Sequence, residues 1–155
     1  MPPRIAVQRE DFDPALVVES LSAGTTEIGA VATFLGLCRS EEGRLAALEL
    51  EHYPGMAEEE IGRVAAEAAA RWPLLGLCVV HRYGLIRPGE RIVIVAAAAR
   101  HRGDAFAAAA FLMDFLKTRA PFWKREHLAD GTLGPWVAAT EADAQAAASW
   151  ERNQG

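Results

Sequence analysis

The chain has 155 residues, of which 51% are hydrophobic and 24% charged, and its formal net charge is −5. This length predicts one domain, residues 1–155, that can bury a core without disulfides or a metal. A net-acidic chain is a poor candidate for nucleic-acid binding, and it has no charge-free apolar run long enough to span a membrane, so we expect neither partner. The two cysteines, Cys38 and Cys78, have no metal-ligand spacing and favour a reducing compartment, which predicts the cytoplasm.

Apolar periodicity and turn residues predict strands and helices that do not alternate strictly. A short strand at 5–7 precedes a helix that begins at Asp13–Pro14 and ends near Ala23. Gly29 and Gly36 in the next strand, 27–39, indicate a bulge or a close backbone approach. The remaining predicted elements are strands at 45–53, 74–83, 91–98 and 136–138, helices at 57–72, 104–118 and 141–152, a turn at Pro88–Gly89 and an extended segment at 122–127. This mixture predicts an α+β fold.

The cations are strongly biased toward arginine. Only Lys117 and Lys124 among the 16 basic residues are lysine. Lysine can give up its proton and arginine cannot, so these two positions are candidates for acid/base chemistry. Survival of two lysines by chance is the alternative.

Both lysines lie in the densest basic stretch, 116–126, around a helix end and a proline. In an extended segment Lys124 and Glu126 point to one side and Arg125 to the other, so Lys124 and Glu126 are either an acid/base pair or a surface ion pair. Lys117 follows the apolar Phe115 and Leu116, which predicts partial burial and a role in proton transfer. Lys124 is then the better electrostatic candidate.

Two further segments are candidates for anion binding. His101 and Arg102 lie between a strand end and a helix start, where backbone N–H groups and the helix dipole attract phosphate. Arg39 ends the strand at 27–39, and Cys38 beside it is either a reactive thiol or an inert buried one. The other histidines, His52, His81 and His127, lack metal-ligand spacing, so we expect no metal and no cofactor.

Several segments closely resemble the family of large, catalytic subunits of molybdopterin synthase. They are LELEHYPGM at 48–56, RWPL at 71–74, the HRxG pattern at 81–84, the pair His101–Arg102 and FLMDFLKTRAPFWKRE at 111–126. The resemblance covers residues 28–150 and implies an α/β hammerhead with an additional β-rich subdomain. It further implies a homodimer that binds one small subunit at each end.

The resemblance also implies an activity. Enzymes of this family convert cyclic pyranopterin monophosphate to molybdopterin with sulfur from the C-terminal thiocarboxylate of a ubiquitin-like small subunit. Lys117 and Lys124 are then catalytic, and the residues in contact with substrate are Leu37, Cys38, Arg39, His101, Arg102, Lys117, Lys124, Arg125 and Glu126. Two alternatives stay open: an adaptor that binds the ubiquitin-like partner without catalysis, and a sulfurtransferase with a persulfide on Cys38.

Overall fold

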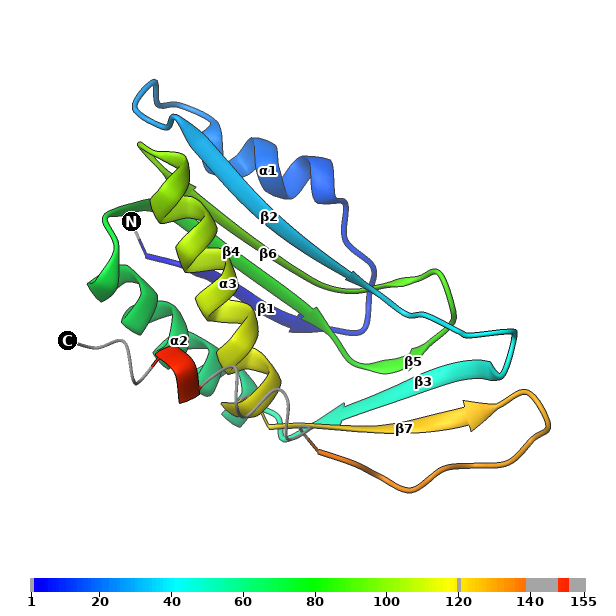
Figure 1. Ribbon diagram of the computed structural model, residues 1–155. Helices are drawn as coiled ribbons and strands as arrows, with labels where there is room; N and C mark the ends of the chain where they lie inside the picture. The colour runs from blue at the N-terminus through cyan, green and yellow to red at the C-terminus, as the bar shows by residue number, and fades with distance from the viewer. Residues whose placement is uncertain (1, 120, 139–147, 151–155) are drawn as a thin grey trace.

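The computed structural model describes residues 2–119, 121–138 and 148–150. These residues form two β-sheets, three longer helices and a helical segment at 148–150, which confirms the predicted α+β class (Figure 1). The elements in chain order are β1 (Arg4–Gln8), α1 (Pro14–Ser22), β2 (Ala30–Leu37), β3 (Leu45–His52), α2 (Met56–Arg71), β4 (Leu74–Arg82), β5 (Gly84–Ile86), β6 (Arg91–Ala99), α3 (Arg102–Arg119) and β7 (Phe122–Leu128).

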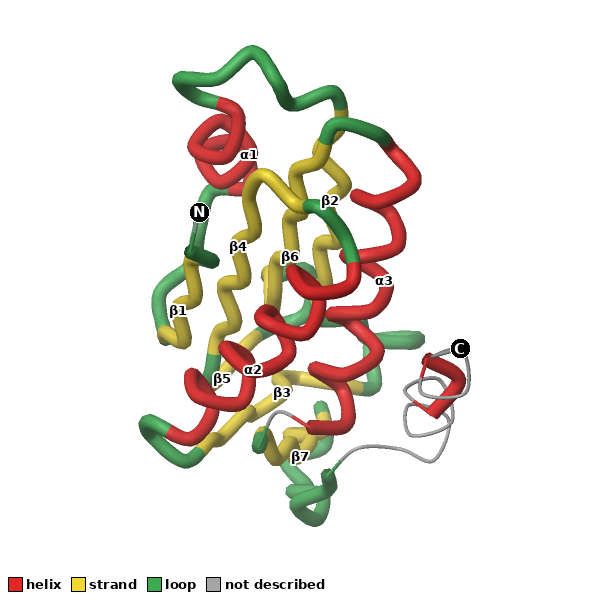
Figure 2. The backbone as a smooth tube through the Cα atoms, turned by 90° about the vertical axis from the view of Figure 1, so that its left-hand side faces the viewer, coloured by secondary structure: helices red, strands yellow, loops and turns green. Residues whose placement is uncertain are grey.

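The larger sheet has the strand order β1-β4-β6-β2 and is covered on both faces. Helices α2 and α3 cover one face and α1 covers the other (Figure 2). Side chains alternate along β4, so that Val79 packs in the core under α2 and α3 while Cys78 packs toward α1. Burial on both faces explains why β4 and β6 are almost continuously apolar in sequence.

The smaller sheet has the order β5-β3-β7 and extends from one end of the larger sheet (Figure 1). The predicted turn at Pro88–Gly89 lies before β6, but the sequence did not predict β5, which pairs with β3 at Leu85 and Ile86. Ile86 is fully buried and pairs with Leu48. A three-residue strand is too short to show an alternating pattern, which is why the sequence did not reveal it.

Two glycines behave as the sequence predicted. A Cβ on Gly29 would lie 2.2 Å from the carbonyl oxygen of Arg100, so only glycine allows this approach at the start of β2. At Gly36 the pairing of β2 with β6 shifts register, which confirms the predicted irregularity. The close approach of Gly29 to Arg100 fixes the loop that leads into α3.

The described C-terminal residues contact first the smaller sheet and then the helices. Val137 forms a β-bridge with Lys124, as the predicted strand at 136–138 requires. The predicted helix at 141–152 lies outside the described residues except for 148–150. Within that stretch Trp150 packs edge-to-face against Trp72 and Phe111. None of the helices that the described residues form is both long and apolar enough to cross a membrane.

Candidate active site

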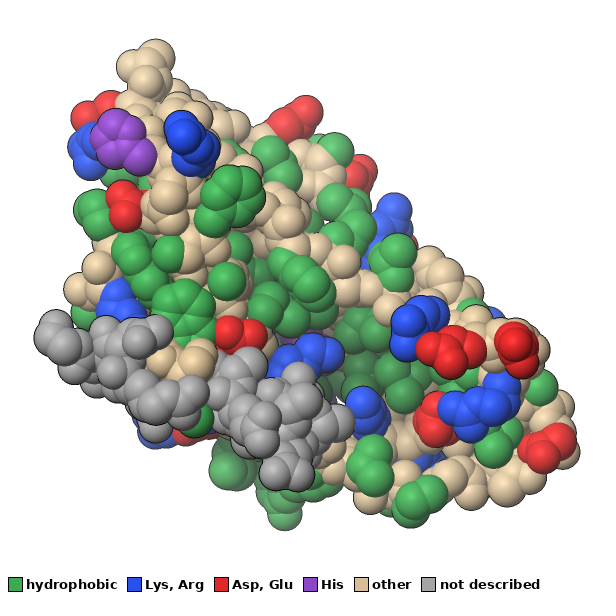
Figure 3. Space-filling view, in the orientation of Figure 1, with side chains coloured by type: hydrophobic (Ala, Val, Ile, Leu, Met, Phe, Trp, Pro, Cys, Tyr) green, Lys and Arg blue, Asp and Glu red, His purple; other side chains and the backbone are tan. Residues whose placement is uncertain are grey.

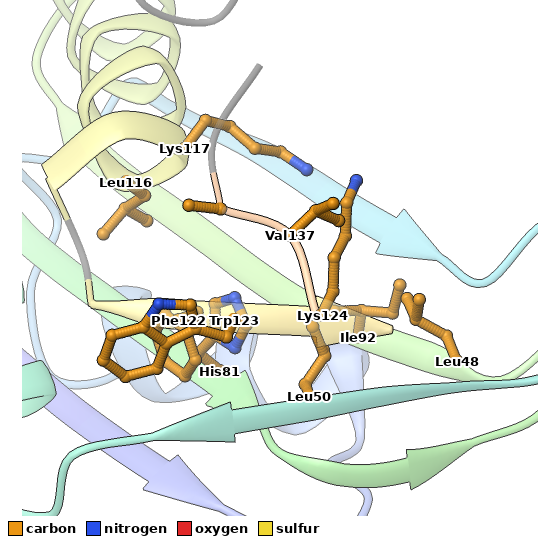
Figure 4. Close-up of a pocket in the computed structure, with 11 residues that line it drawn as sticks. Leu48, Leu50, His81, Ile92, Leu116, Lys117, Phe122, Trp123, Lys124 and Val137 are labelled. Atoms are coloured by element: carbon orange, nitrogen blue, oxygen red, sulfur yellow. The ribbon is translucent and has the colours of Figure 1, made fainter. Parts of the chain in front are cut away.

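A pocket lies where the last turn of α3 faces β7, and we call it the lysine pocket. Basic side chains flank an apolar hollow between the larger sheet with its helices and the smaller sheet (Figure 3). Figure 4 shows Lys117 from α3 and Lys124 from β7 extending toward one another across the opening. The described residues that line the pocket are Leu48, Leu50, His81, Ile92, Leu116, Lys117, Phe122, Trp123, Lys124, Val137 and Ala138. Two ammonium groups over apolar walls suit an anionic group on a slender ligand.

Lys117 is held by the buried side of α3. Phe115 and Leu116 are buried in the core, and they fix the last turn from which Lys117 projects. The expectation that Lys117 is partly buried is wrong, because its side chain is exposed at the mouth of the pocket. Its buried neighbours point inward, whereas Lys117 lies on the open face of the helix.

Lys124 is fixed through its backbone on both sides. It pairs with Leu50 of β3, and its N–H and C=O bond Val137 at 2.9 and 2.7 Å. Glu126 lies two residues on, but its carboxylate bonds Arg44 at 3.2 Å instead of forming the predicted pair with Lys124. Lys124 is therefore available to a ligand in the pocket.

His81 is a site residue that the sequence reasoning missed. The alternation that turns Val79 toward α3 also places His81, two residues later, on the helix side of β4. Its Nδ1 bonds the carbonyl oxygen of Arg82 at 2.8 Å, and its ring stacks on Phe122 at 3.9 Å between centroids. Burial, the largest cause, lowers the pKa of His81 to about 4; the bond to Arg82 opposes this shift and the charge of Lys117 adds to it.

A second pocket, which we call the edge pocket, opens beside the lysine pocket toward the edge strand β2. It shares His81, Ile92, Leu116 and Lys117 with the lysine pocket. Its other described lining residues are Phe34, Leu35, Gly36, Leu37, Val93 and Met113. Lys117 and His81 thus lie where two adjoining cavities meet, which suits a reaction between two separate ligands.

Of the candidates 37–39, Leu37 lines the edge pocket and the next two residues do not. Cys38 is 3% exposed, and burial raises the pKa of its thiol. A buried thiol of raised pKa is a poor nucleophile, so the structure favours the inert interpretation. Arg39 is exposed and forms an ion pair with Glu41 at 2.9 Å.

His101 and Arg102 lie at the N-terminal end of α3, as predicted from the strand-to-helix junction. Both are exposed and near helix N–H groups, a geometry suited to phosphate. Lys117 is at the other end of the same helix, about 22 Å away along its axis at 1.5 Å per residue. One chain therefore does not bring its two predicted anion sites together.

Arg125 projects from the opposite face of β7 to Lys124. Its guanidinium bonds Glu49 at 3.1 Å and lies over the ring of Trp136. His127 bonds the same carboxylate oxygen at 2.8 Å, and this bond, then those from Arg125, hold the pKa of Glu49 below its ordinary value. Arg125 thus stabilises the pairing of β3 with β7 rather than lining the lysine pocket.

No group of three or more potential metal ligands occurs among the residues that the structure describes. The fold and the site together define a class: an α+β protein with a two-lysine pocket between a helix end and a smaller accessory sheet. Residues 7–119 match the model of the family described as MoaE protein. The chain belongs to this family, which confirms the resemblance found in the sequence.

Individual proteins show the same relationship. The molybdopterin synthase catalytic subunit of Mesorhizobium japonicum is 62% identical over 149 residues, 96% of this chain and 94% of that protein. The subunit of the same name from Brucella melitensis is 61% identical over 97% of this chain and 92% of that protein. The solved structure of the MoaE protein from Burkholderia ambifaria superimposes with a TM-score of 0.83 at 47% identity, covering 96% of this chain and 98% of that one.

Proposed function

We propose that this chain is the catalytic subunit of a molybdopterin synthase. It converts cyclic pyranopterin monophosphate to molybdopterin with sulfur from the C-terminal thiocarboxylate of a ubiquitin-like small subunit. The observation that carries the proposal is the lysine pocket, where Lys117 and Lys124 face one another over apolar walls in a chain of this family. A slender tail that ends in an anionic group fits this shape and charge.

The residues divide the work by their chemistry. Lys117 and Lys124 polarise the carbonyl as sulfur leaves the terminal carbon, and they manage the protons of that step. Arg39, His101 and Arg102 hold the substrate phosphate through charge-assisted hydrogen bonds. Leu37 contributes to the wall of the edge pocket, where the pterin binds.

The direct test is a reconstitution. The protein is incubated with thiocarboxylated small subunit and the cyclic pterin phosphate, and dithiolene formation is followed. We expect turnover with the intact small subunit and none with a small subunit that lacks its last two residues. Tight binding of the small subunit without pterin binding or turnover would instead indicate the adaptor.

The distance along α3 leads to a proposal about assembly. Because Arg102 lies about 22 Å from Lys117 in one chain, we propose that a second copy supplies His101 and Arg102 to each lysine pocket. A two-fold dimer places the same residues reciprocally at two sites.

In the hammerhead description that the resemblance implies, the larger sheet with its helices is the main body. The smaller sheet is then the additional subdomain of this single domain.

Mixing two inactive variants tests the shared site. One carries Lys117→Ala, and the other carries His101→Ala with Arg102→Ala. A random mixture regains about one quarter of wild-type activity, because half of the dimers are mixed and each has one intact site. A mixture as inactive as its components would show that each copy uses only its own residues.

We place the reaction in the cytoplasm, where the free thiols of Cys38 and Cys78 stay reduced.

A further inference from the structure

The imidazole of His81 is held in one orientation and one tautomer. A carbonyl oxygen only accepts, so the 2.8 Å bond between Nδ1 and the Arg82 carbonyl requires the hydrogen to be on Nδ1. The neutral ring therefore keeps a lone pair on Nε2. Stacking on Phe122, with 15° between the ring planes, fixes the direction of that lone pair.

The lone pair has no protein partner among the described residues. The one hydrogen bond that the His81 side chain forms with the described residues is that of Nδ1. Among the described residues, the fully buried side-chain nitrogen or oxygen atom that lacks a partner is Nδ1 of His52. Nε2 of His81 also lacks a partner there but is not such a fully buried atom, so it is accessible. Because His81 lines the lysine pocket, its Nε2 is within reach of a ligand there.

Every other polar side chain among the described lining residues is a donor. Lys117 and Lys124 offer ammonium hydrogens, and Trp123 offers an indole N–H. The rest of this lining is apolar. His81 is thus the only described side chain in the pocket wall that accepts a hydrogen bond.

A peptide tail brings both kinds of group into such a pocket. Its terminal anion pairs with the lysines, but its last backbone N–H leaves water and needs an acceptor. A terminal glycine has no Cβ, so this N–H can approach the wall closely. We propose that Nε2 of His81 accepts a hydrogen bond from the last backbone N–H of the small subunit's tail. The inference rests on the proposed function, since it needs a peptide tail in the lysine pocket.

The experiment removes the donor and the acceptor separately. A semisynthetic small subunit carries an ester in place of its last peptide bond, which deletes that one N–H. His81→Asn keeps an amide N–H able to bond Arg82 but has no acceptor at the position of Nε2. His81→Gln restores an acceptor near that position. Calorimetry measures binding of the normal and ester tails to the wild type and to both variants.

We expect the ester to weaken binding to the wild type and to His81→Gln about 5–10-fold, the worth of one hydrogen bond. His81→Asn binds the normal tail about as weakly and shows no further loss with the ester. An equal loss from the ester in wild type and His81→Asn would overturn the proposal. So would weaker pterin binding by His81→Asn with unchanged tail binding.

Two controls keep the result interpretable. Thermal unfolding shows whether His81→Asn is folded; if it is not, an ester tail that binds the wild type as tightly as the normal tail still overturns the proposal. Failure of the proposed function looks different. In that case the wild type binds intact and tail-truncated small subunits equally, and this inference is wrong with it.

Discussion

His81 and Phe122 stack nearly parallel, with 3.9 Å between ring centroids and 15° between planes. The contact joins β4 of the larger sheet to β7 of the smaller one. The ring of His52 also lies near Phe122, with 5.9 Å between centroids, and contacts the ring of Tyr83 at 4.3 Å. Phe122 therefore sets the position of the strand that carries Lys124.

Removing the Phe122 ring should affect both stability and activity. We expect Phe122→Ala to lower the free energy of unfolding by about 2–4 kcal/mol, less than for a fully buried ring because Phe122 is only partly buried. It should also lower activity, because the strand that carries Lys124 loses its contact with His81. Denaturant unfolding and dithiolene formation measure the two effects. Phe122→Tyr keeps the stacked ring and serves as the control; a loss of activity as large in this variant would argue against the stacking role.

The two lysines should not tolerate arginine. Lys117→Arg and Lys124→Arg keep the positive charge, but a guanidinium group is fork-shaped and cannot release a proton. Each variant should therefore lose about 10²–10⁴-fold in rate. Steady-state dithiolene formation measures the loss. The matched control is Arg63→Lys on the exposed face of α2, where Arg63 pairs with Glu59 and Glu60 and no effect on rate is expected. Near-wild-type rates in the double lysine variant would mean that the lysines supply charge alone.

The neutral His81 predicts loss of stability in acid. Its pKa is about 4 in the folded state and about 6.5 in the unfolded chain, so the unfolded state binds more protons between these values. The free energy of unfolding should therefore fall as pH drops from 6.5 to 4, by about 2–3 kcal/mol from this residue. Denaturant unfolding at pH 7.5 and pH 4.5 measures the drop. His81→Gln should reduce it, and an unchanged drop would assign the effect to other groups.

Gly29 should be intolerant of even one methyl group. The Cβ of Gly29→Ala would lie 2.2 Å from the Arg100 carbonyl oxygen, so the backbone must move, at a cost of about 1–3 kcal/mol. The same shift displaces the loop before His101 and should weaken phosphate binding. Gly103→Ala is the control, because no atom lies within 4 Å of its Cβ position and alanine favours a helix. Unfolding midpoints that are equal for both variants would contradict the tight approach.

The Cys38 thiol should be dispensable for sulfur transfer. Cys38 is buried, and burial raises the pKa of its thiol, which disfavours the reactive thiolate. We expect Cys38→Ala to retain near-wild-type dithiolene formation with a stability loss of about 1 kcal/mol. Cys78→Ala, which alters the other buried thiol, is the matched control. Loss of activity in Cys38→Ala alone would revive the persulfide alternative.

The sequence by itself determined the α+β class and the family, and it singled out the two lysines as candidates. Turn residues and periodicity placed α3 and β4 within a few residues, because these elements are bounded by Pro, Gly or charged loops and have strongly apolar faces. For Gly29 the sequence left a bulge or a close approach open, and the structure shows the close approach. The apolar strand at 27–39 was expected to be largely buried, but β2 lies at the sheet edge and exposes Phe34, Leu35 and Leu37. These features depend on local geometry and composition.

Only the tertiary structure decided which candidate residues meet. Lys117 and Lys124 come from different elements, and the pairing of β7 with β3 brings them to one opening. The same pairing turns Arg125 toward Glu49, and Glu126 turns to Arg44, partners that are distant in sequence. His81 was missed because its role depends on the end of α3 and on Phe122, which lie more than thirty residues further along the chain. Contacts between distant segments arise from packing of the whole chain, and no local pattern records them.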